Sequence, residues 1–287
     1  MPAKPILLLL LLTCIAGACS AQAYIDIANV KGIISPDAGI FRRNNSANEL
    51  VYYSFSSTLP IKLSKKENYI IVSPFIERWV VNEKDFSAAE QDYNGLCFPV
   101  TYAHELNSHF SLSGTFIARW NGHSKLVYDD AFQYGGAVLF NWKKSTGLKY
   151  KFGLYYNRDE FGNFIVPLAG IDWQMDNNTL LTGILPGSLT LEKKSGNLFY
   201  YGIVFRAITN SYNRTINQYI RIDDNRVMLF ADYYVTKHLV INTELGHSVF
   251  RQLRYGNETE GKQYFYKKKV KDNLLLQVSL AYRIRLL

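Results

Sequence analysis

Hydrophobic and polar residues alternate strictly over several stretches of the chain, most clearly in the last one. Between residues 274 and 286 every even-numbered position is Leu, Val, Tyr or Ile, whereas the odd-numbered positions include Gln277, Ser279 and Arg283. Successive side chains of a β-strand point to opposite faces, so this pattern predicts a strand with one apolar and one polar face. The same period of two recurs at 51–61, 110–120, 132–142 and 148–156, and helical spacing fits none of these windows.

Such alternation is typical both of a membrane-spanning β-barrel and of a water-soluble β-sandwich. The apolar runs are longer than sandwich strands usually are, and the polar face carries charges well inside the predicted strands. Aromatic residues also gather towards strand ends, as an interfacial girdle requires. We therefore predict an all-β fold, a transmembrane antiparallel β-barrel. The expected lipid-facing and girdle residues are Trp120, Trp142, Tyr150, Phe152 and Tyr282.

The number of strands depends on the first stretch of the mature chain. Long polar connections are expected at 83–95, 121–131, 158–163, 209–218 and 254–271. They all fall at one end of the barrel if residues 24–34 form a strand and if Pro186-Gly187 makes a type II turn, with positive φ at the glycine. The count is then 14. Residues 24–34 alternate poorly, so a 12-stranded barrel, with Pro186-Gly187 inside one continuous strand, stays open as an alternative.

The N-terminal segment resembles a secretory leader. Lys4 precedes an aliphatic run, and small residues follow around positions 16–23. We expect residues 1–21 to be a signal peptide and residues 22–287 to form a single barrel domain. The alternative is lipidation at Cys19, which would leave the protein lipid-anchored.

Composition narrows the classes further. The formal charge is +8, but Lys and Arg are dispersed along the chain, which gives little support for nucleic-acid binding. Hydrophobic residues make up 48% of the chain and charged ones 20%, which excludes intrinsic disorder. Only Cys97 lies outside the leader, so no internal disulfide can form, and no Cys/His cluster has zinc spacing. His104 and His109 are five apart, not four, so we expect neither a metal nor a cofactor.

Two motifs carry a resemblance to known proteins. A strand-like segment at 164–173 contains Pro-Leu-x-Gly-x-x-Trp, and a tight turn leads from 181–185 into 188–190. On these residues the chain resembles an uncharacterised family of bacterial outer-membrane β-barrels of the Bacteroidota type. The resemblance implies the cell outer membrane as the location and a barrel as the fold, and it supplies no catalytic residues.

The alternation also predicts which charged side chains point into the barrel. The expected lumen-facing residues, forming either a selectivity filter or a salt-bridged plug, are Lys149, Lys151, Arg119, Glu105, Asp232, Glu244, Arg283 and Arg285. We expect a non-enzymatic monomer that acts as a porin-like pore or uptake channel, or as a structural envelope protein. Its expected partners are outer-membrane lipid and, during biogenesis, the barrel-assembly machinery.

Two other functions remain open from the sequence. One is a lipid-modifying hydrolase at the membrane rim, for which His123 and Ser124 are the candidate pair because adjacent loop residues can adapt to each other. The other is a soluble or lipid-anchored exported β protein that binds an apolar ligand.

Overall fold

The computed structural model describes seven ranges of the chain and consists of β-structure almost throughout. The ranges are residues 24–34, 50–63, 68–82, 90–123, 131–257, 263–269 and 274–286. The predicted signal peptide, Cys19 and Ser124 lie outside them. None of the described residues forms a helix of the length and apolarity that crossing a membrane requires.

The described residues form seventeen strand segments in one sheet. They are β1 (Tyr24–Ile34), β2 (Leu50–Ser56), β3 (Leu59–Lys62), β4 (Tyr69–Val72), β5 (Phe75–Asn82), β6 (Glu90–Glu105), β7 (Phe110–His123), β8 (Phe132–Ser145), β9 (Leu148–Asp159), β10 (Gly162–Gln174), β11 (Thr179–Leu185), β12 (Ser188–Ser195), β13 (Phe199–Thr215), β14 (Gln218–Tyr234), β15 (Leu239–Asn257), β16 (Gln263–Lys269) and β17 (Leu274–Arg285).

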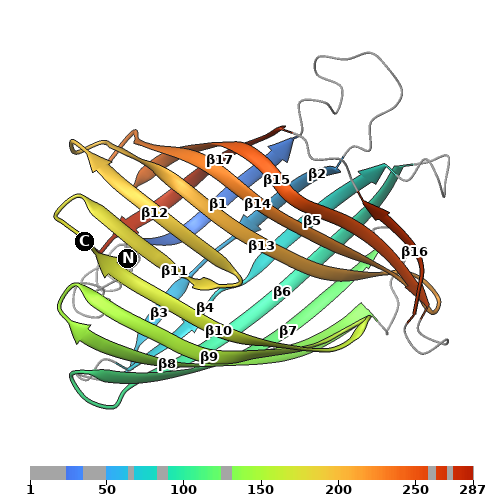
Figure 1. The fold of residues 1–287 in the computed structure, drawn as a ribbon, viewed down its shortest axis with the longest axis horizontal. Coiled ribbons are helices and arrows are strands. Elements are labelled where there is room, and N and C mark those ends of the chain that lie inside the picture. The colour runs from blue at the N-terminus through green and yellow to red at the C-terminus, as the bar shows by residue number, and fades with distance from the viewer. Residues whose placement is uncertain are drawn as a thin grey trace, which may run out of the picture.

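These segments make a closed antiparallel barrel of 14 strands, as predicted (Figure 1). β2 and β3 follow each other in one strand position of the ring, and β4 and β5 follow each other in the next. β2 pairs with β5, β3 pairs with β4, and both β4 and β5 pair with β6. β16 and β17 likewise share β15 as a neighbour. The ring closes because β1 pairs with β17 as well as with β2. The 12-stranded alternative is therefore wrong.

The first strand alternates poorly for a local reason. β1 pairs with β17 from Tyr24↔Arg285 to Ile34↔Leu276, and the register shifts between Asp26 and Ala28. Such a bulge inserts one extra residue and changes which positions face inwards. The period of two therefore breaks within the strand, although the strand itself is complete.

The outer surface of the wall is apolar, as a bilayer-facing surface must be. Phe116, Leu154, Ile165 and Leu229 are 58–66% exposed. A soluble protein rarely exposes so large a continuous apolar surface, whereas an outward apolar band is the normal exterior of a membrane barrel.

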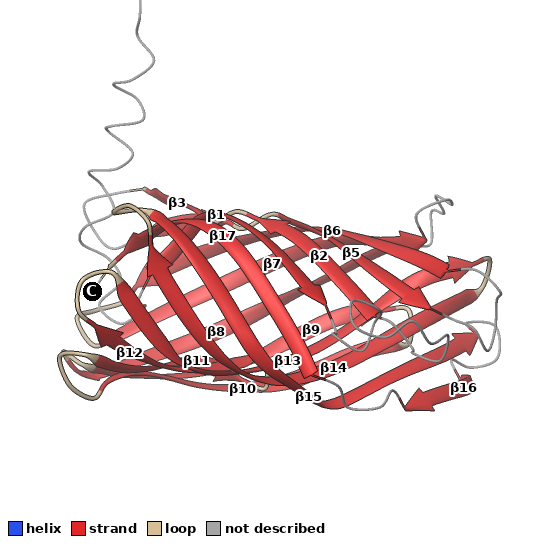
Figure 2. Ribbon diagram, turned by 90° about the horizontal axis from the view of Figure 1, so that it is seen from above, coloured by secondary structure: helices blue, strands red, loops and turns tan. Residues whose placement is uncertain are grey.

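The strands are inclined to the long axis of the barrel (Figure 2). We call the end where β1 begins and β17 ends the terminus end, and the opposite end the loop end.

Two expected loops at the loop end are strands. β9 and β10 are joined only by Glu160-Phe161, and β13 and β14 only by Ile216-Asn217, where Asn217 has a φ of 61° that asparagine tolerates. The prediction of loops at 158–163 and 209–218 is therefore wrong. In this part of β13 both faces are covered by protein, so no lipid-facing apolar positions mark the strand. The expected loop at 254–271 is wrong in part, since 254–257 belong to β15 and 263–269 form β16.

The β11–β12 hairpin is much shorter than its neighbours. β11 and β12 have seven and eight residues, whereas β13 and β14 have seventeen each and β15 nineteen. Its Pro186-Gly187 tip is a turn, as the 14-strand count requires. The prediction of a type II turn is wrong, since Gly187 does not have a positive φ.

Candidate functional site: a lumen filled at one end

The loop half of the lumen is filled by a hydrophobic and aromatic core. We call it the loop-half core; it consists of Ile33, Tyr52, Trp79, Val81, Tyr93, Val204, Tyr212, Ile220, Ile222, Met228, Phe230, Leu253, Tyr255 and Leu275. These side chains come from one run of neighbouring strands in the ring, β6, β5, β2, β1, β17, β15, β14 and β13, and the walls at the two ends of this run approach each other across the lumen. The rings of Tyr52 and Trp79 lie 4.5 Å apart, and the Arg226 guanidinium lies 5.7 and 5.6 Å from them. The two walls therefore meet across the lumen.

One buried carboxylate ties these walls together. Glu77 on β5 accepts hydrogen bonds from the Tyr52 hydroxyl (3.0 Å), the Tyr212 hydroxyl (2.6 Å) and the Asn210 amide (3.0 Å). Asn210 also accepts a bond from Arg119, one of the predicted lumen residues, at 3.0 Å. Tyr212 and Asn210 belong to β13, more than 130 residues away in sequence. Sequence reasoning missed Glu77, because residues 75–82 carry apolar side chains in both phases and give no alternation to read.

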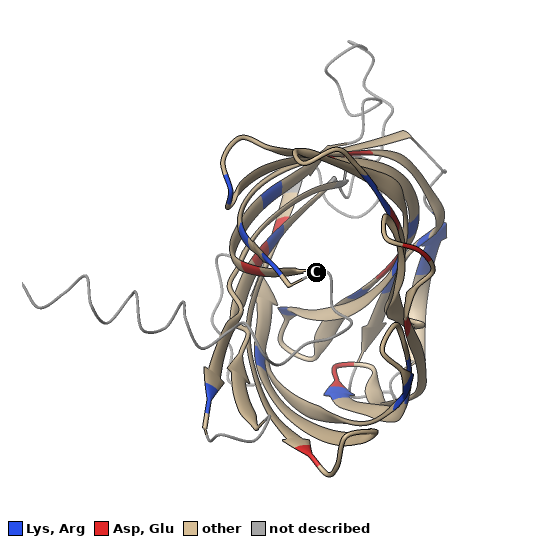
Figure 3. Cartoon of the chain, turned by 90° about the vertical axis from the view of Figure 1, so that its left-hand side faces the viewer, with Lys and Arg blue, Asp and Glu red and all other residues tan. Residues whose placement is uncertain are grey.

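In the terminus half, one side of the lumen is filled by paired charges. Arg283 bonds Asp26 through Nε (2.6 Å) and Asp232 through Nη1 (2.5 Å). The predicted residues Asp232, Glu244, Arg283 and Arg285 all lie on this side, and all are buried or half-buried. Acidic and basic positions are found on several strands around the barrel (Figure 3).

Two further ion pairs complete the filled side. Arg206 holds Glu244 with a bidentate contact of 2.5 and 2.8 Å. Arg285 holds Glu192 with two contacts of 2.7 Å. Neither Glu192 nor Asp26 was among the predicted residues, because nothing in the sequence spacing indicates which strands face each other across the ring.

The other side of the terminus half is lined by small polar groups that remain accessible to water. We call it the vestibule; its lumen-facing, half-buried residues are Thr101, Glu105, Ser111, Thr115, Asn141, Lys143, Lys149, Lys151, Thr182 and Thr190. Asp172 is the buried acid of this side: Lys151 Nζ lies 2.7 Å and Lys149 Nζ 4.0 Å from its carboxylate. The Thr182 hydroxyl donates to it at 2.6 Å.

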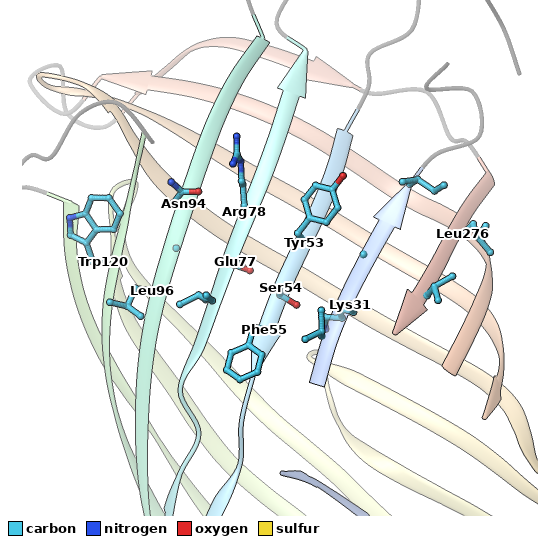
Figure 4. Close-up of a pocket in the computed structure, with 16 residues that line it drawn as sticks. Lys31, Tyr53, Ser54, Phe55, Glu77, Arg78, Asn94, Leu96, Trp120 and Leu276 are labelled. Carbon is cyan, nitrogen blue, oxygen red and sulfur yellow. The ribbon is translucent and has the colours of Figure 1, made fainter. Parts of the chain in front are cut away.

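The predicted girdle residues lie on the exterior. Trp142 and Tyr150 face outwards with ring centroids 5.7 Å apart, and Phe152 and Tyr282 are exposed. Trp120 lies at the edge of a groove of about 900 Å³ on the outer face of the wall (Figure 4).

This groove crosses β17, β1, β2, β5, β6 and β7. It is lined largely by apolar groups, among them Val30, Phe55, Ile76 and Leu96. The same strands contribute to the loop-half core on their inner side. A wall drawn inwards to meet the opposite wall is concave on its lipid-facing side, so the groove follows from the filling of the loop half.

Of the candidate catalytic pair, the structure describes His123 alone, because Ser124 lies outside the described residues. His123 Nε2 lies 2.8 Å from the Gln91 side-chain oxygen, and its ring meets Tyr93 edge-on at 5.7 Å. His104 Nδ1 lies 3.4 Å from the Tyr102 hydroxyl, and His109 Nδ1 lies 3.0 Å from the Ser108 hydroxyl. Among the residues that the structure describes, no three His, Cys, Asp or Glu side chains are placed to hold a metal ion.

No protein-family model and no curated protein matches the chain. Several solved structures do. A deletion mutant of TodX, described as a monoaromatic hydrocarbon channel, is 9% identical with a TM-score of 0.44, over 94% of this chain and 92% of that one. The toluene transporter TodX of P. putida is 8% identical with a TM-score of 0.43, over 94% and 91%. A mutant porin of Rh. blastica is 6% identical with a TM-score of 0.26, over 90% and 99%. At these scores the likeness adds nothing to the barrel already described.

Proposed function

We propose that this protein is an outer-membrane channel for solutes, open to water at the terminus end and closed at the loop end in the conformation described. The observation that carries the proposal is the unequal filling of the lumen. Threonine, serine, asparagine and lysine side chains line the vestibule and stay half-buried, whereas Trp79, Tyr93 and Tyr212 in the loop half are fully buried. Uptake therefore requires the loop-half core to loosen.

The charge of the vestibule supports a role in handling solutes. Lys143, Lys149 and Lys151 line it together with Glu105 and Asp172. Charged groups at a narrow passage select solutes by sign as well as by size. On the filled side, in contrast, Asp232, Glu244 and Arg283 are buried as well as paired, so we assign it a structural role.

Conductance in planar lipid bilayers tests this proposal. Wild-type protein should show no steady conductance steps, because the two walls meet through the loop-half core. The double variant Trp79→Ala, Tyr212→Ala removes two fully buried rings from facing walls and should give discrete steps. Leu229→Ala changes a side chain that is 64% exposed on the lipid face, and serves as the control that stays silent.

Two results would contradict the proposal. The double variant could be folded, as shown by a heat-dependent shift on a gel, and still show no conductance steps. In that case the vestibule does not connect to the loop end, and the protein has a structural role. If wild type itself conducts steadily, then the loop-half core does not close the lumen.

The hydrolase alternative gains no support from the geometry. Ser248 donates its hydroxyl proton to Asp224 at 2.6 Å, inside an ion-pair group with Arg226 and Arg251. Ser108 and His109 do share a hydrogen bond of 3.0 Å, but in an exposed turn at the terminus end. We therefore propose a non-enzymatic role.

A further inference from the structure

The groove on the outer face of the wall is lined by two parallel rows of side chains. β1, β2, β5, β6 and β7 are paired side by side in this region, so residues at one level of the wall form a row across the strands. The first row is apolar and consists of Val30, Phe55, Ile76, Leu96 and Trp120. The second row lies nearer the loop end and consists of Gly32, Tyr53, Arg78 and Asn94. Figure 4 shows Tyr53, Arg78 and Asn94 side by side, with Phe55 and Leu96 beneath them.

The second row presents polar groups to the surroundings of the barrel. The Arg78 side chain is 52% exposed, Tyr53 is exposed and Asn94 is half-buried. Arg78 Nη2 donates to the Asp92 carboxylate on β6, which holds the guanidinium in place. A guanidinium carries five N–H donors, so this contact occupies only part of its capacity.

The change from the first row to the second fixes the depth of the groove in the bilayer. On β5 the exposed Ile76 is followed in the same phase by Arg78, and on β6 Leu96 is preceded by Asn94. A charge on the lipid face of a barrel is costly at the bilayer midplane and nearly free at the interface. The second row therefore lies at the level of the lipid head groups, and the first row lies in hydrocarbon.

A glycine keeps the groove open between the two rows. Gly32 occupies an outward position of β1, next to Tyr53 on β2 and Val278 on β17. A Cβ at this position would lie 3.5 Å from the Tyr53 ring, which is ordinary contact, so the backbone itself leaves room for a larger side chain. The groove has a volume of about 900 Å³, within the range of pockets that bind small molecules.

We propose that this groove is a binding site for one membrane lipid with a phosphate in its head group. The phosphate binds Arg78, beside the Tyr53 hydroxyl and the Asn94 amide, and an acyl chain lies along the first row in the space that Gly32 leaves. Arginine suits this role because its planar fork of donors matches the oxygens of a phosphate. A charged row that continues into an apolar groove matches a lipid, whereas a free phosphate would use the charged row alone.

The lipid stays outside the barrel in this arrangement. The strands beneath the groove are hydrogen-bonded to one another, and their inner side is covered by the loop-half core. The site is therefore separate from the vestibule, and the inference does not depend on the proposed channel function.

Native mass spectrometry of the full-length protein in detergent micelles tests the site. The protein is titrated with dimyristoyl phosphatidylglycerol, and with dimyristoylglycerol, which has the same chains but no phosphate. Arg78→Gln removes the charge at the head-group level, and Gly32→Leu fills the groove. Arg158→Gln changes an exposed arginine near the loop end of β9, and Gly114→Leu adds the same side chain at an exposed glycine of β7 with no atom within 4 Å of its Cβ. Each variant is first shown to be folded by the heat-dependent shift on a gel.

Wild type should retain one phosphatidylglycerol molecule more tightly than dimyristoylglycerol. Arg78→Gln should weaken phosphatidylglycerol binding about tenfold, as the loss of a hydrogen bond to a charged group implies. Gly32→Leu should weaken the binding of both lipids, because its side chain occupies the place of the acyl chain. Arg158→Gln and Gly114→Leu should bind as wild type does.

Four results would overturn the site. Wild type that retains no phosphatidylglycerol has no such site, and equal binding of the two lipids means that the phosphate is not recognised. Wild-type affinity in Arg78→Gln means that the head group lies elsewhere. Wild-type affinity in Gly32→Leu, or an equal loss in Gly114→Leu, means that the groove does not hold the chain.

Discussion

Replacing Arg283 by methionine should destabilise the barrel strongly. The Arg283 side chain is 4% exposed, and its guanidinium contacts Asp26 at 2.6 and 3.1 Å and Asp232 at 2.5 Å. Asp26 lies on β1, Arg283 on β17 and Asp232 on β14, so the group joins the first strand to the last at the closure of the ring. Arg283→Met keeps much of the aliphatic stem but leaves two carboxylates without their cation.

The expected loss follows from the burial of those carboxylates. Asp232 is 1% exposed and Asp26 19%. Removing one partner of a buried ion pair typically costs about 3–5 kcal/mol, because the remaining charge is left uncompensated. This corresponds to a change on the order of 10²–10⁴-fold in the unfolding equilibrium constant. Tryptophan fluorescence during urea unfolding in lipid vesicles measures this change.

Two comparisons separate the ion pair from other effects. Lys144→Met removes an exposed charge at the end of β8 and should stay within about 0.5 kcal/mol of wild type. Adding Asp26→Asn and Asp232→Asn to Arg283→Met removes the stranded charges and should restore part of the stability. The reasoning is refuted if Arg283→Met unfolds within about 1 kcal/mol of wild type, or if the triple variant is no more stable than the single one.

Three further perturbations probe the wall and the filled lumen. Leu154→Arg, on the lipid face, should cost about 2–4 kcal/mol in vesicle unfolding, and a neutral result would contradict the outward assignment. Gly202→Ala would place a Cβ 1.9 Å from the Leu191 carbonyl and should cost about 1–3 kcal/mol, whereas Gly114→Ala, with no atom within 4 Å, should be neutral; equal effects would argue against the β12–β13 register. Ser248→Ala removes a 2.6 Å bond to the buried Asp224 and should cost about 1–3 kcal/mol by the same assay, and an unchanged stability would mean that water replaces the hydroxyl.

Much of the fold could be predicted from the sequence because a barrel strand carries its own signal. Lipid on one side and lumen on the other impose a period of two, so β7, β8, β9 and β17 were all recognisable from local residues. The signal weakened where that physical cause was absent. At the bulge in β1 the phase shifts, and in the loop-end part of β13 neither face meets lipid.

The phase of a regular strand predicts which of its side chains face inwards, whereas the groups that they meet there depend on how the ring closes. Phase places Asp232 and Arg283 in the lumen, but their contact requires β14 and β17 to approach across a closed ring. The same holds for Glu77 and Tyr212, whose contact joins opposite walls, and for Ser211, which meets Asn121 and Gln133 in the part of β13 that continues beyond the end of β12. Alternation is a property of neighbours along one strand, whereas the filling of the lumen depends on contacts between residues that only the closure of the ring brings together.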